Sequence, residues 1–422
     1  HGLGGTLLGD GQGVVFRPDP DARLVFDWPS GFGVPHPLRL DGEIAGWRDG
    51  GAWRIQTPGL RVEGEGYAAD ARGGLSFEGD GTRPRLDLAA DVDAAQIPVA
   101  KKFWVRHTMP VAAREWLDMA LVAGTVRNGR GIVAGDLDDW PFGAADGKDG
   151  RGVFFAEGDI ADATIRFQDE WPAMTRLGGH VRFLNDGFRL DPSTGELVGV
   201  PLRDVVAGIR NYGQTPVEVA ATAQADARQL LALMRQSPFQ NEHAETLDAL
   251  DVVGPAQVAV SVVAGHGAPM RLDGEVQLEG VAMREARFDL AFDQVRGPVA
   301  FDQSGFHADA LDAHQDGQAG TLALRAGAGH VRQHGNAFEG ELDMPLDASA
   351  LLARAPDLAW LRPHVRGRAP WQVQVAVPNA PAVDGALAAR LVLRSDLVGT
   401  TLRLPAPLDK PAGRALRTTI EA

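Results

Sequence analysis

Residues 371–377 read Trp-Gln-Val-Gln-Val-Ala-Val, with an apolar side chain at every odd position. The same alternation recurs at residues 24–28, 85–92 and 287–293. A period of two is that of a β-strand, whose successive side chains point to opposite faces of the sheet. One apolar and one polar face is typical of antiparallel sheets, because buried parallel strands are apolar on both faces. The sequence therefore predicts a mainly β protein with antiparallel pairing.

The composition fits this class and excludes others. Hydrophobic residues make up 44% of the 422 residues, and the 52 glycines and 27 prolines suit frequent turns between strands. A formal net charge of −15 would repel a nucleic-acid backbone, so nucleic acid is not expected as a partner. The absence of cysteine excludes disulfides and thiolate chemistry. No apolar run is long enough, at about 18 residues, to span a membrane as a helix.

Short helices are predicted between the strands, at residues 110–122, 226–236 and 347–354. Asp226 and Asp347 stand where an N-cap carboxylate would accept free backbone N–H groups. The dipeptides Asp273-Gly274 and Asp384-Gly385 predict hairpin turns.

An internal repeat is indicated by residues 179–188 and 297–306, which share Gly, Val, Phe, Gly and Phe at an offset of 118 residues. Asp226 and Asp347 are 121 residues apart, so both markers indicate a repeat of about 120 residues. The alternative is a chance similarity within a glycine-rich β protein. The repeat predicts four segments: a partial one at 1–95, two full ones at 96–215 and 216–342, and a partial one at 343–422. Stacked in this way, they predict an elongated, curved, taco-like antiparallel β-sheet groove with short α-helices interspersed.

The sequence carries no recognisable catalytic motif. It lacks a Gly-x-Ser-x-Gly elbow, a phosphate loop and a His-Glu-x-x-His zinc motif, so no enzyme and no cofactor are expected. His330 and His334 are interpreted as solvent-facing rather than as metal ligands. Asp136, Asp138, Asp139, Asp146 and Asp149 lack the spacing of a calcium loop and are interpreted as a solvated acidic loop, so no metal is expected.

Two aromatic–proline pairs, Trp140-Pro141 and Trp171-Pro172, leave two interpretations open. An aromatic residue before proline in an extended segment is usually a packing anchor at a strand end. The other interpretation is a contact with ligand at the rim of the groove.

Two blocks of sequence resemble a known family. The first begins at Met109-Pro110 and continues through Trp116-Leu117, Gly135-Asp-Leu-Asp-Asp-Trp-Pro-Phe142, Gly158-Asp-Ile-Ala-Asp-Ala-Thr164 and Trp171-Pro172. The second comprises Ser395-Asp-Leu-Val-Gly399 and Leu404-Pro-Ala-Pro-Leu-Asp-Lys-Pro-Ala412, where Asp409 replaces the family's usual glycine. These blocks resemble the YhdP family of AsmA-like envelope proteins, which are relatives of TamB. The resemblance covers residues 95–422 well and the first 95 only in character.

The resemblance implies a large protein of the Gram-negative periplasm, held in the inner membrane by a helix that would lie outside this chain. Its expected function is to conduct glycerophospholipid between the inner and outer membranes. The expected partners are phospholipid acyl chains, the inner membrane and periplasmic or outer-membrane proteins. The family has no catalytic residues to transfer, so the site has to be inferred from the strands.

The candidate groove-lining residues are the apolar members of the alternating stretches. They are Leu24, Phe26, Trp28, Leu86, Leu88, Ile165, Phe167, Val181, Phe183, Val258, Val260, Leu272, Val276, Leu278, Phe288, Leu290, Phe292, Val299, Phe301, Leu322, Leu324, Trp371, Val373, Val375, Val377, Leu402 and Leu404. Aliphatic and aromatic side chains suit hydrocarbon because the contact is non-directional. A structural or scaffolding module with a closed core would show the same alternation, so that alternative stays open.

Overall fold

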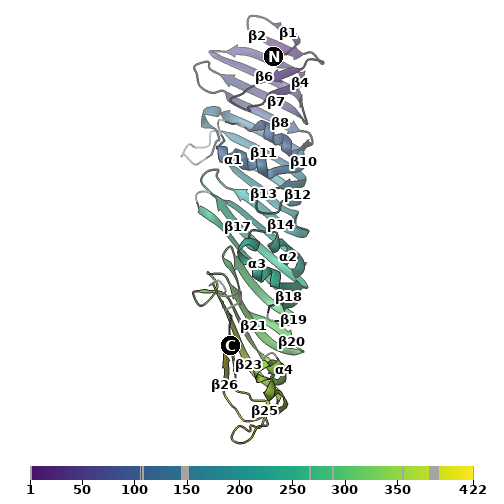
Figure 1. The fold of residues 1–422 in the computed structure, drawn as a ribbon. Coiled ribbons are helices and arrows are strands. Elements are labelled where there is room, and N and C mark those ends of the chain that lie inside the picture. The colour runs from purple at the N-terminus through teal and green to yellow at the C-terminus, as the bar shows by residue number, and fades with distance from the viewer. Residues whose placement is uncertain are drawn as a thin grey trace. The chain divides into compact units, whose positions relative to one another are not determined.

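The chain is described by a computed structural model that covers residues 2–104, 106, 109–143, 152–265, 268–287, 289–353, 356–379 and 389–421. It divides into two compact units. Unit 1 comprises His1–Thr222 and Val262–Met270, and unit 2 comprises Ala223–Ser261 and Arg271–Ala422. The register of every described strand pair is antiparallel, and the strands of each unit lie side by side (Figure 1). The predicted mainly β, antiparallel class is therefore confirmed.

Unit 1 begins with strands joined by short turns and continues with helical segments and further strands. Its elements are β1 (Gly5–Gly9), β2 (Gly13–Pro18), β3 (Leu24–Phe26), β4 (His36–Gly42), β5 (Ile44–Asp49), β6 (Ala52–Gly64), β7 (Tyr67–Phe77), β8 (Arg85–Val92), β9 (Ala95–Gln96), the 3₁₀ helix η1 (Ile97–Phe103), α1 (Val111–Ala120), β10 (Leu121–Asp136), the 3₁₀ turn η2 (Leu137–Asp139), β11 (Val153–Ile165), β12 (Met174–Leu184), β13 (Gly187–Leu197) and β14 (Val200–Ile209). Three further strands contain residues of both units, namely β15 (Val217–Asp226), β17 (Pro255–Gly265) and β18 (Ala268–Glu285).

In unit 2, helices come directly before two runs of consecutive strands. Its elements are α2 (Ala227–Arg235), α3 (Phe239–Ala249), β16 (Leu250–Val253), β19 (Leu290–Asp302), β20 (Gly305–Gln315), β21 (Gln318–Ala326), β22 (Asn336–Asp347), α4 (Ala348–Ala353), the 3₁₀ helix η4 (Pro356–His364), β23 (Val365–Pro378), β24 (Arg390–Ser395), β25 (Thr400–Leu402) and β26 (Thr418–Glu421). Among the described residues, none of the helices combines the length and the apolar character that crossing a membrane requires.

The three predicted helices exist. Helix α1 ends at Ala120, so the prediction ran two residues too far; Leu121 already begins β10. Asp226 is the N-cap of α2, and its carboxylate accepts the Arg228 N–H at 2.8 Å. Asp347 precedes α4 and accepts the Ala350 N–H at 3.1 Å. Arg354, the last residue of the third prediction, lies outside the described residues.

The internal repeat appears in the structure as two equivalent hairpins. Phe183 pairs with Phe188 across the β12–β13 turn, and Phe301 pairs with Phe306 across the β19–β20 turn. The 118-residue offset is therefore the same on both strands of the hairpin, which confirms the predicted equivalence of these segments. The division of the chain into four repeats stays a prediction.

The predicted turn at Asp273-Gly274 is wrong, because both residues lie inside β18. Gly274 pairs with Phe301, and a Cβ at this glycine would lie 2.2 Å from the aromatic ring. Glycine is present here because the neighbouring ring packs over the backbone. The second dipeptide, Asp384-Gly385, lies outside the described residues.

β-Bulges interrupt most of the long strand pairs. Register shifts fall between Ile160 and Ala163 in β11, and between Glu279 and Val281 in β18. The bulged positions adopt positive φ, as at Asp162 (51°) and Gly280 (97°). Bulges bend a strand and increase its local twist. Within each unit they therefore curve the sheet near the same strand ends that the helices adjoin.

Candidate functional site: an apolar sheet face

In unit 2, apolar residues form rows that run across neighbouring strands. One row, the Leu311 row, consists of Leu311, Leu322, Leu342, Val373 and Leu393, which are successive register partners from β20 to β24. Directly paired residues share a face of the sheet. The row therefore makes a continuous apolar stripe perpendicular to the strands.

A second row lies two residues away from the first on β21, β22, β23 and β24, and three residues away on β20, where a bulge adds one residue. This Val375 row consists of Ala308, Leu324, Gly340, Val375 and Leu391. Because the side-chain period of a strand is two, both rows occupy one face. Leu324, Val375 and Leu391 are only partly buried, whereas Leu311 is 1% and Leu322 4% exposed.

Helix α2 contributes to the hydrophobic cluster of unit 2. Ala227 of α2 belongs to the cluster that contains Leu311, Leu322 and Phe292, and Leu230 and Leu324 pack against it. Residues of one cluster therefore differ in exposure, and the partly buried ones keep some of their surface accessible.

Unit 1 has an equivalent row across seven strands. It consists of Ala71, Ala90, Gly131, Ala156, Phe183, Phe188 and Ile209, each the register partner of the next. The ring centroids of Phe183 and Phe188, which are neighbours in this row, lie 5.2 Å apart. Small residues therefore occupy one half of the row and large apolar residues the other.

The predicted groove residues fall into three exposure groups. Leu272, Phe292, Leu322, Trp371 and Val377 are buried, whereas Phe26 and Trp28 are exposed. The partly buried group comprises Leu24, Leu86, Leu88, Ile165, Phe167, Val181, Phe183, Val258, Val260, Val276, Leu278, Leu290, Val299, Phe301, Leu324, Val373, Val375, Leu402 and Leu404. Phe288 lies outside the described residues. The structure brings many of these residues onto the same face, and their contact with a ligand stays a prediction.

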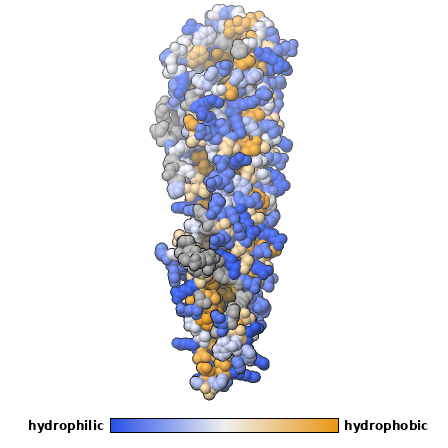
Figure 2. All heavy atoms as spheres, in the orientation of Figure 1, coloured by the Kyte–Doolittle hydropathy of each residue, from blue (hydrophilic) through white to orange (hydrophobic). Residues whose placement is uncertain are grey.

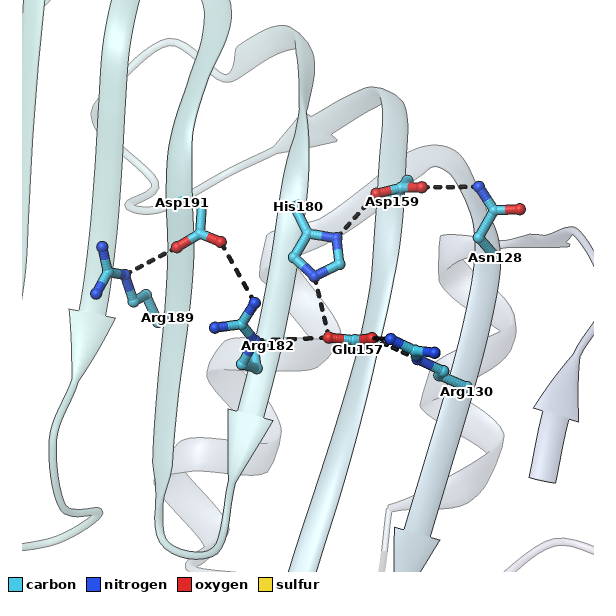
Figure 3. Close-up of polar contacts among 8 residues, drawn as sticks. All are labelled: Asn128, Arg130, Glu157, Asp159, His180, Arg182, Arg189 and Asp191. Atoms are coloured by element: carbon cyan, nitrogen blue, oxygen red, sulfur yellow. Dashed lines mark hydrogen bonds and ion pairs between the residues drawn. The ribbon is translucent and has the colours of Figure 1, made fainter. Parts of the chain in front are cut away.

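The opposite face of unit 1 carries a connected polar network (Figure 3). Glu157 of β11 accepts from Arg130 of β10 and lies 3.3 Å from His180 of β12. The other ring nitrogen of His180 lies 2.9 Å from Asp159, which accepts from Asn128 at 2.8 Å. The network continues through Arg182, Asp191 and Arg189. It links four strands across the polar face.

The network shifts the pKa values of its members. Hydrogen bonding to Asp159 raises the pKa of His180 despite partial burial, with Glu157 adding to the effect. Burial by itself would raise the pKa of Glu157, but hydrogen bonds from Arg130 and His180 outweigh it and lower that pKa. Each shift favours the charged form. Charged side chains therefore pair across neighbouring strands on the face of unit 1 opposite its apolar row.

Figure 2 shows hydrophilic residues over most of the face in view, interrupted by hydrophobic ones. Large apolar side chains that keep at least a third of their surface exposed include Leu7, Trp53, Ile132, Leu184 and Trp360. Isolated exposed apolar residues are normal on protein surfaces and do not by themselves indicate a binding site.

An aromatic cluster lies at the strand ends of the N-terminal part of unit 1. The ring of Phe32 is its centre, with ring centroids 5.6 Å from Trp28, 5.2 Å from His36 and 6.0 Å from Phe103. Tyr67 adjoins Phe103 at 4.8 Å. Sequence reasoning placed Trp28 on the apolar face but missed the other four. The available signal was the density of aromatic residues between positions 26 and 36.

A cavity of about 240 Å³ adjoins the aromatic cluster. Its lining residues are Val34, Pro35, His36, Pro37, Glu65, Tyr67 and Lys102. Lys102 Nζ lies 2.7 Å from Glu65 Oε2, and this ion pair is solvent-accessible. Burial raises the pKa of Tyr67, so its hydroxyl keeps its proton.

The interpretation of both histidines as solvent-facing is wrong for His330, whose side chain is only 10% exposed, whereas His334 is exposed. His330 Nδ1 lies 2.9 Å from His307 Nδ1, and its Nε2 lies 3.0 Å from Asp302. Burial would raise the pKa of Asp302, but bonds from Ser304 and His330 lower it to about 2. Across the described part of the chain, no group of three or more His, Asp or Glu residues has a metal-binding arrangement.

The acidic loop and the aromatic–proline pairs have structural roles where they are described. Asp136 caps η2 by accepting the Asp138 N–H at 2.9 Å. Trp140 packs edge-on against Phe142, which is 2% exposed, and against Phe154. This packing supports the anchor interpretation for Trp140. Asp146 and Asp149 lie outside the described residues.

Comparison with known proteins gives two matches. The model of a family described as YhdP protein matches residues 16–422. A relative from Escherichia coli (strain K12), named intermembrane phospholipid transporter YhdP, is 22% identical over 369 residues. The alignment covers 87% of this chain and 28% of the relative, so the chain spans well under a third of that protein. No solved structure matches the chain.

Proposed function

This chain belongs to the YhdP family, and from that premise we propose that it is a segment of a phospholipid conduit. Acyl chains would lie along the apolar face of the antiparallel sheet and move across its strands. The similarity to a protein named as an intermembrane phospholipid transporter supports the substrate class. The observation that carries the proposal is the Val375 row, whose larger side chains remain partly accessible on an apolar face that crosses successive strands.

The physical problem that such a face solves is the exposure of hydrocarbon. A diacyl lipid has two chains of about 16 carbons, and each CH₂ exposed to water costs about 0.8 kcal/mol. The gross penalty for passage through water is therefore on the order of 25 kcal/mol. A continuous apolar stripe offsets it at every position along the path. Non-directional contact lets the chains slide, whereas a deep specific pocket would retain them.

The place of action and the partners are part of the same proposal. The segment would lie in the periplasm of a Gram-negative bacterium, within a longer protein held at the inner membrane. Proteins of the periplasm or outer membrane would complete the route. An envelope location is consistent with the name of the relative, an intermembrane transporter.

A scaffold with a closed core is the second candidate function. It is favoured by the tightly buried part of the unit 2 cluster, in which Val295 is 0% and Leu311 1% exposed. In that case the apolar rows would stabilise the fold and take no ligand.

Two measurements separate the candidates. Native mass spectrometry and lipid extraction of the purified chain should detect bound phospholipid. A photo-crosslinking residue at position 375 should label lipid, whereas the same residue at position 374 should not, because neighbouring residues of a strand point to opposite faces. Absence of co-purified lipid together with no labelling from position 375 would leave the scaffold as the function.

A further inference from the structure

The cavity beside the aromatic cluster combines chemical groups that the acyl-chain path does not use. Its lining includes the Lys102 ammonium, the Glu65 carboxylate, the Tyr67 hydroxyl and the His36 imidazole. An ammonium, a carboxylate, a phenol and an imidazole thus surround a space of about 240 Å³. Contact with acyl chains would not need these polar groups, because hydrocarbon contacts are non-directional and apolar.

His36 provides an independent observation. Its side chain is nearly buried, at 4% exposure, and its Nε2 has no hydrogen-bond partner among the described residues. Phe32 and Phe103 pack on its ring, with centroids 5.2 and 5.1 Å away. A buried polar atom without a partner is unfavourable and calls for an explanation. His36 lines the cavity, but this nitrogen has almost no accessible surface, so a ligand would bond to it only after the ring reoriented.

The cavity lies next to the apolar face and not on the polar one. His36 pairs with Phe26, and Leu38 pairs with both Leu24 and Gly64, which in turn pairs with Tyr67. Because His36 and Leu38 are two residues apart on β4, these side chains share one face. A molecule whose hydrocarbon lies against this face can therefore place its polar end in the cavity.

The ion pair between Lys102 and Glu65 is suited to an exchange of partners. Their side chains are 37% and 82% exposed, and exposed ion pairs contribute little to stability. A phosphate would draw the Lys102 ammonium, since charge-assisted bonds to phosphate are strong. A neighbouring ammonium would take the place of Lys102 beside Glu65.

We propose that this cavity binds the head group of a zwitterionic phospholipid, with the phosphate at Lys102 and His36 and the ammonium at Glu65. The proposal rests on the proposed function, because it assumes that the acyl chains occupy the adjoining apolar face. It adds a substrate class, a phosphodiester bearing a primary ammonium, and a place where the lipid is held by its polar end.

The test uses the whole chain and four soluble probes. These are dihexanoyl phosphatidylethanolamine, dihexanoyl phosphatidylglycerol, dihexanoylglycerol and free phosphoethanolamine. Lys102→Met should weaken binding of phosphatidylethanolamine by about tenfold, the effect of losing one charged hydrogen bond. Binding of dihexanoylglycerol, which has no phosphate, should be unchanged. Lys102→Arg should restore most of the affinity.

Lys101→Met is the matched control. Lys101 is the neighbouring lysine of η1, and its Nζ donates instead to the Asp118 carbonyl at 2.6 Å. It should bind all four probes as the wild type does. Glu65→Gln should weaken phosphatidylethanolamine but not phosphatidylglycerol, because only the former carries an ammonium.

The outcomes separate this proposal from the proposed function. If every variant binds dihexanoylglycerol and phosphatidylethanolamine as the wild type does, the head-group site is wrong and the acyl-chain path stands. If phosphoethanolamine alone binds as tightly as the lipid, the cavity takes a free phosphate compound and the lipid proposal is overturned. If the wild type binds no diacyl probe, both proposals fail. Thermal melting of each variant checks that the fold is retained.

Discussion

Single residues of this protein join separate segments of the chain through charge-assisted hydrogen bonds. His180 is central in unit 1, since its two ring nitrogens reach carboxylates of the neighbouring strand. In unit 2, the buried Lys410 has a comparable role without a carboxylate. Its Nζ donates to the carbonyls of Leu397 and Thr400, each at 2.7 Å. Both residues join segments that are distant along the chain or separated by a turn.

The raised pKa of His180 predicts a specific pH dependence of stability. Its folded pKa lies above the unfolded value of about 6.5, so its contribution is complete below about pH 6.5 and is lost as pH rises through the folded pKa. Denaturant unfolding of the wild type and His180→Gln should therefore differ more at about pH 5.5 than at about pH 8.5. A difference that is the same at both pH values would show that protonated His180 does not stabilise the fold.

Lys410→Met should destabilise unit 2 by about 3 kcal/mol, because carbonyls that now accept from a buried ammonium would lose their donor. Lys410 is 2% exposed, so water cannot readily replace the ammonium. Arg403→Met, which alters an exposed cation nearby, should change stability by less than about 0.5 kcal/mol. Equal losses in the two variants, measured by denaturant unfolding, would contradict the assigned role of Lys410.

At the scale of elements, one residue can determine both where a helix begins and how the chain enters the next strand. The Asp226 carboxylate accepts the Arg228 N–H of α2 and also the Gly254 N–H at 3.2 Å, before β17 begins. The side chain of Gln229 returns a bond to the Asp226 backbone at 3.2 Å. One aspartate therefore fixes both the start of a helix and the chain that returns to the sheet.

This double role predicts unequal effects of two otherwise similar substitutions. Asp347→Ala removes the cap bond to Ala350 and should cost about 1 kcal/mol. Asp226→Ala removes a cap and also leaves the Gly254 N–H without its acceptor, so about 2 kcal/mol is expected. Chemical denaturation of both variants provides the measurement. An equal loss would mean that the bond to Gly254 contributes nothing.

At the scale of the whole chain, the decisive quantity is how much of the apolar face stays accessible. Leu290 and Leu311 offer a matched pair in unit 2, because both belong to or pack against one hydrophobic cluster. Leu311 is 1% exposed, whereas Leu290 is partly buried. The two leucines therefore sample the covered and the accessible parts of the same face.

Leu290→Asp should cost about 1 kcal/mol and abolish lipid binding, because a charge on the path repels acyl chains while water can still reach it. Leu311→Asp should cost about 4 kcal/mol or more, since it buries an unpaired charge. Thermal melting combined with lipid extraction compares them. Collapse of the fold in Leu290→Asp, to the extent seen with Leu311→Asp, would favour a closed core.

Much of the fold followed from local sequence patterns. Alternation at residues 371–377 predicted β23, and Asp226 predicted the start of α2, because strand period and N-cap chemistry depend on a few neighbouring residues. The hairpin repeat was visible for the same reason. The turn predicted at Gly274 was wrong because this position is a glycine for another reason. The ring of Phe301, on the next strand, packs where a Cβ of residue 274 would lie. Helix α3 was not predicted.

By itself, the sequence determined that this protein has strands with one apolar and one polar face, short capped helices and repeated hairpins. Only the tertiary structure decided which apolar residues are covered, since Leu311 is buried in a cluster whose members extend from Ala227 to Met344 along the chain. The same holds for the cavity, where His36, Glu65 and Lys102 meet from separate segments. The physical reason is that alternation specifies the face on which a side chain lies, whereas its exposure depends on what else packs against that face.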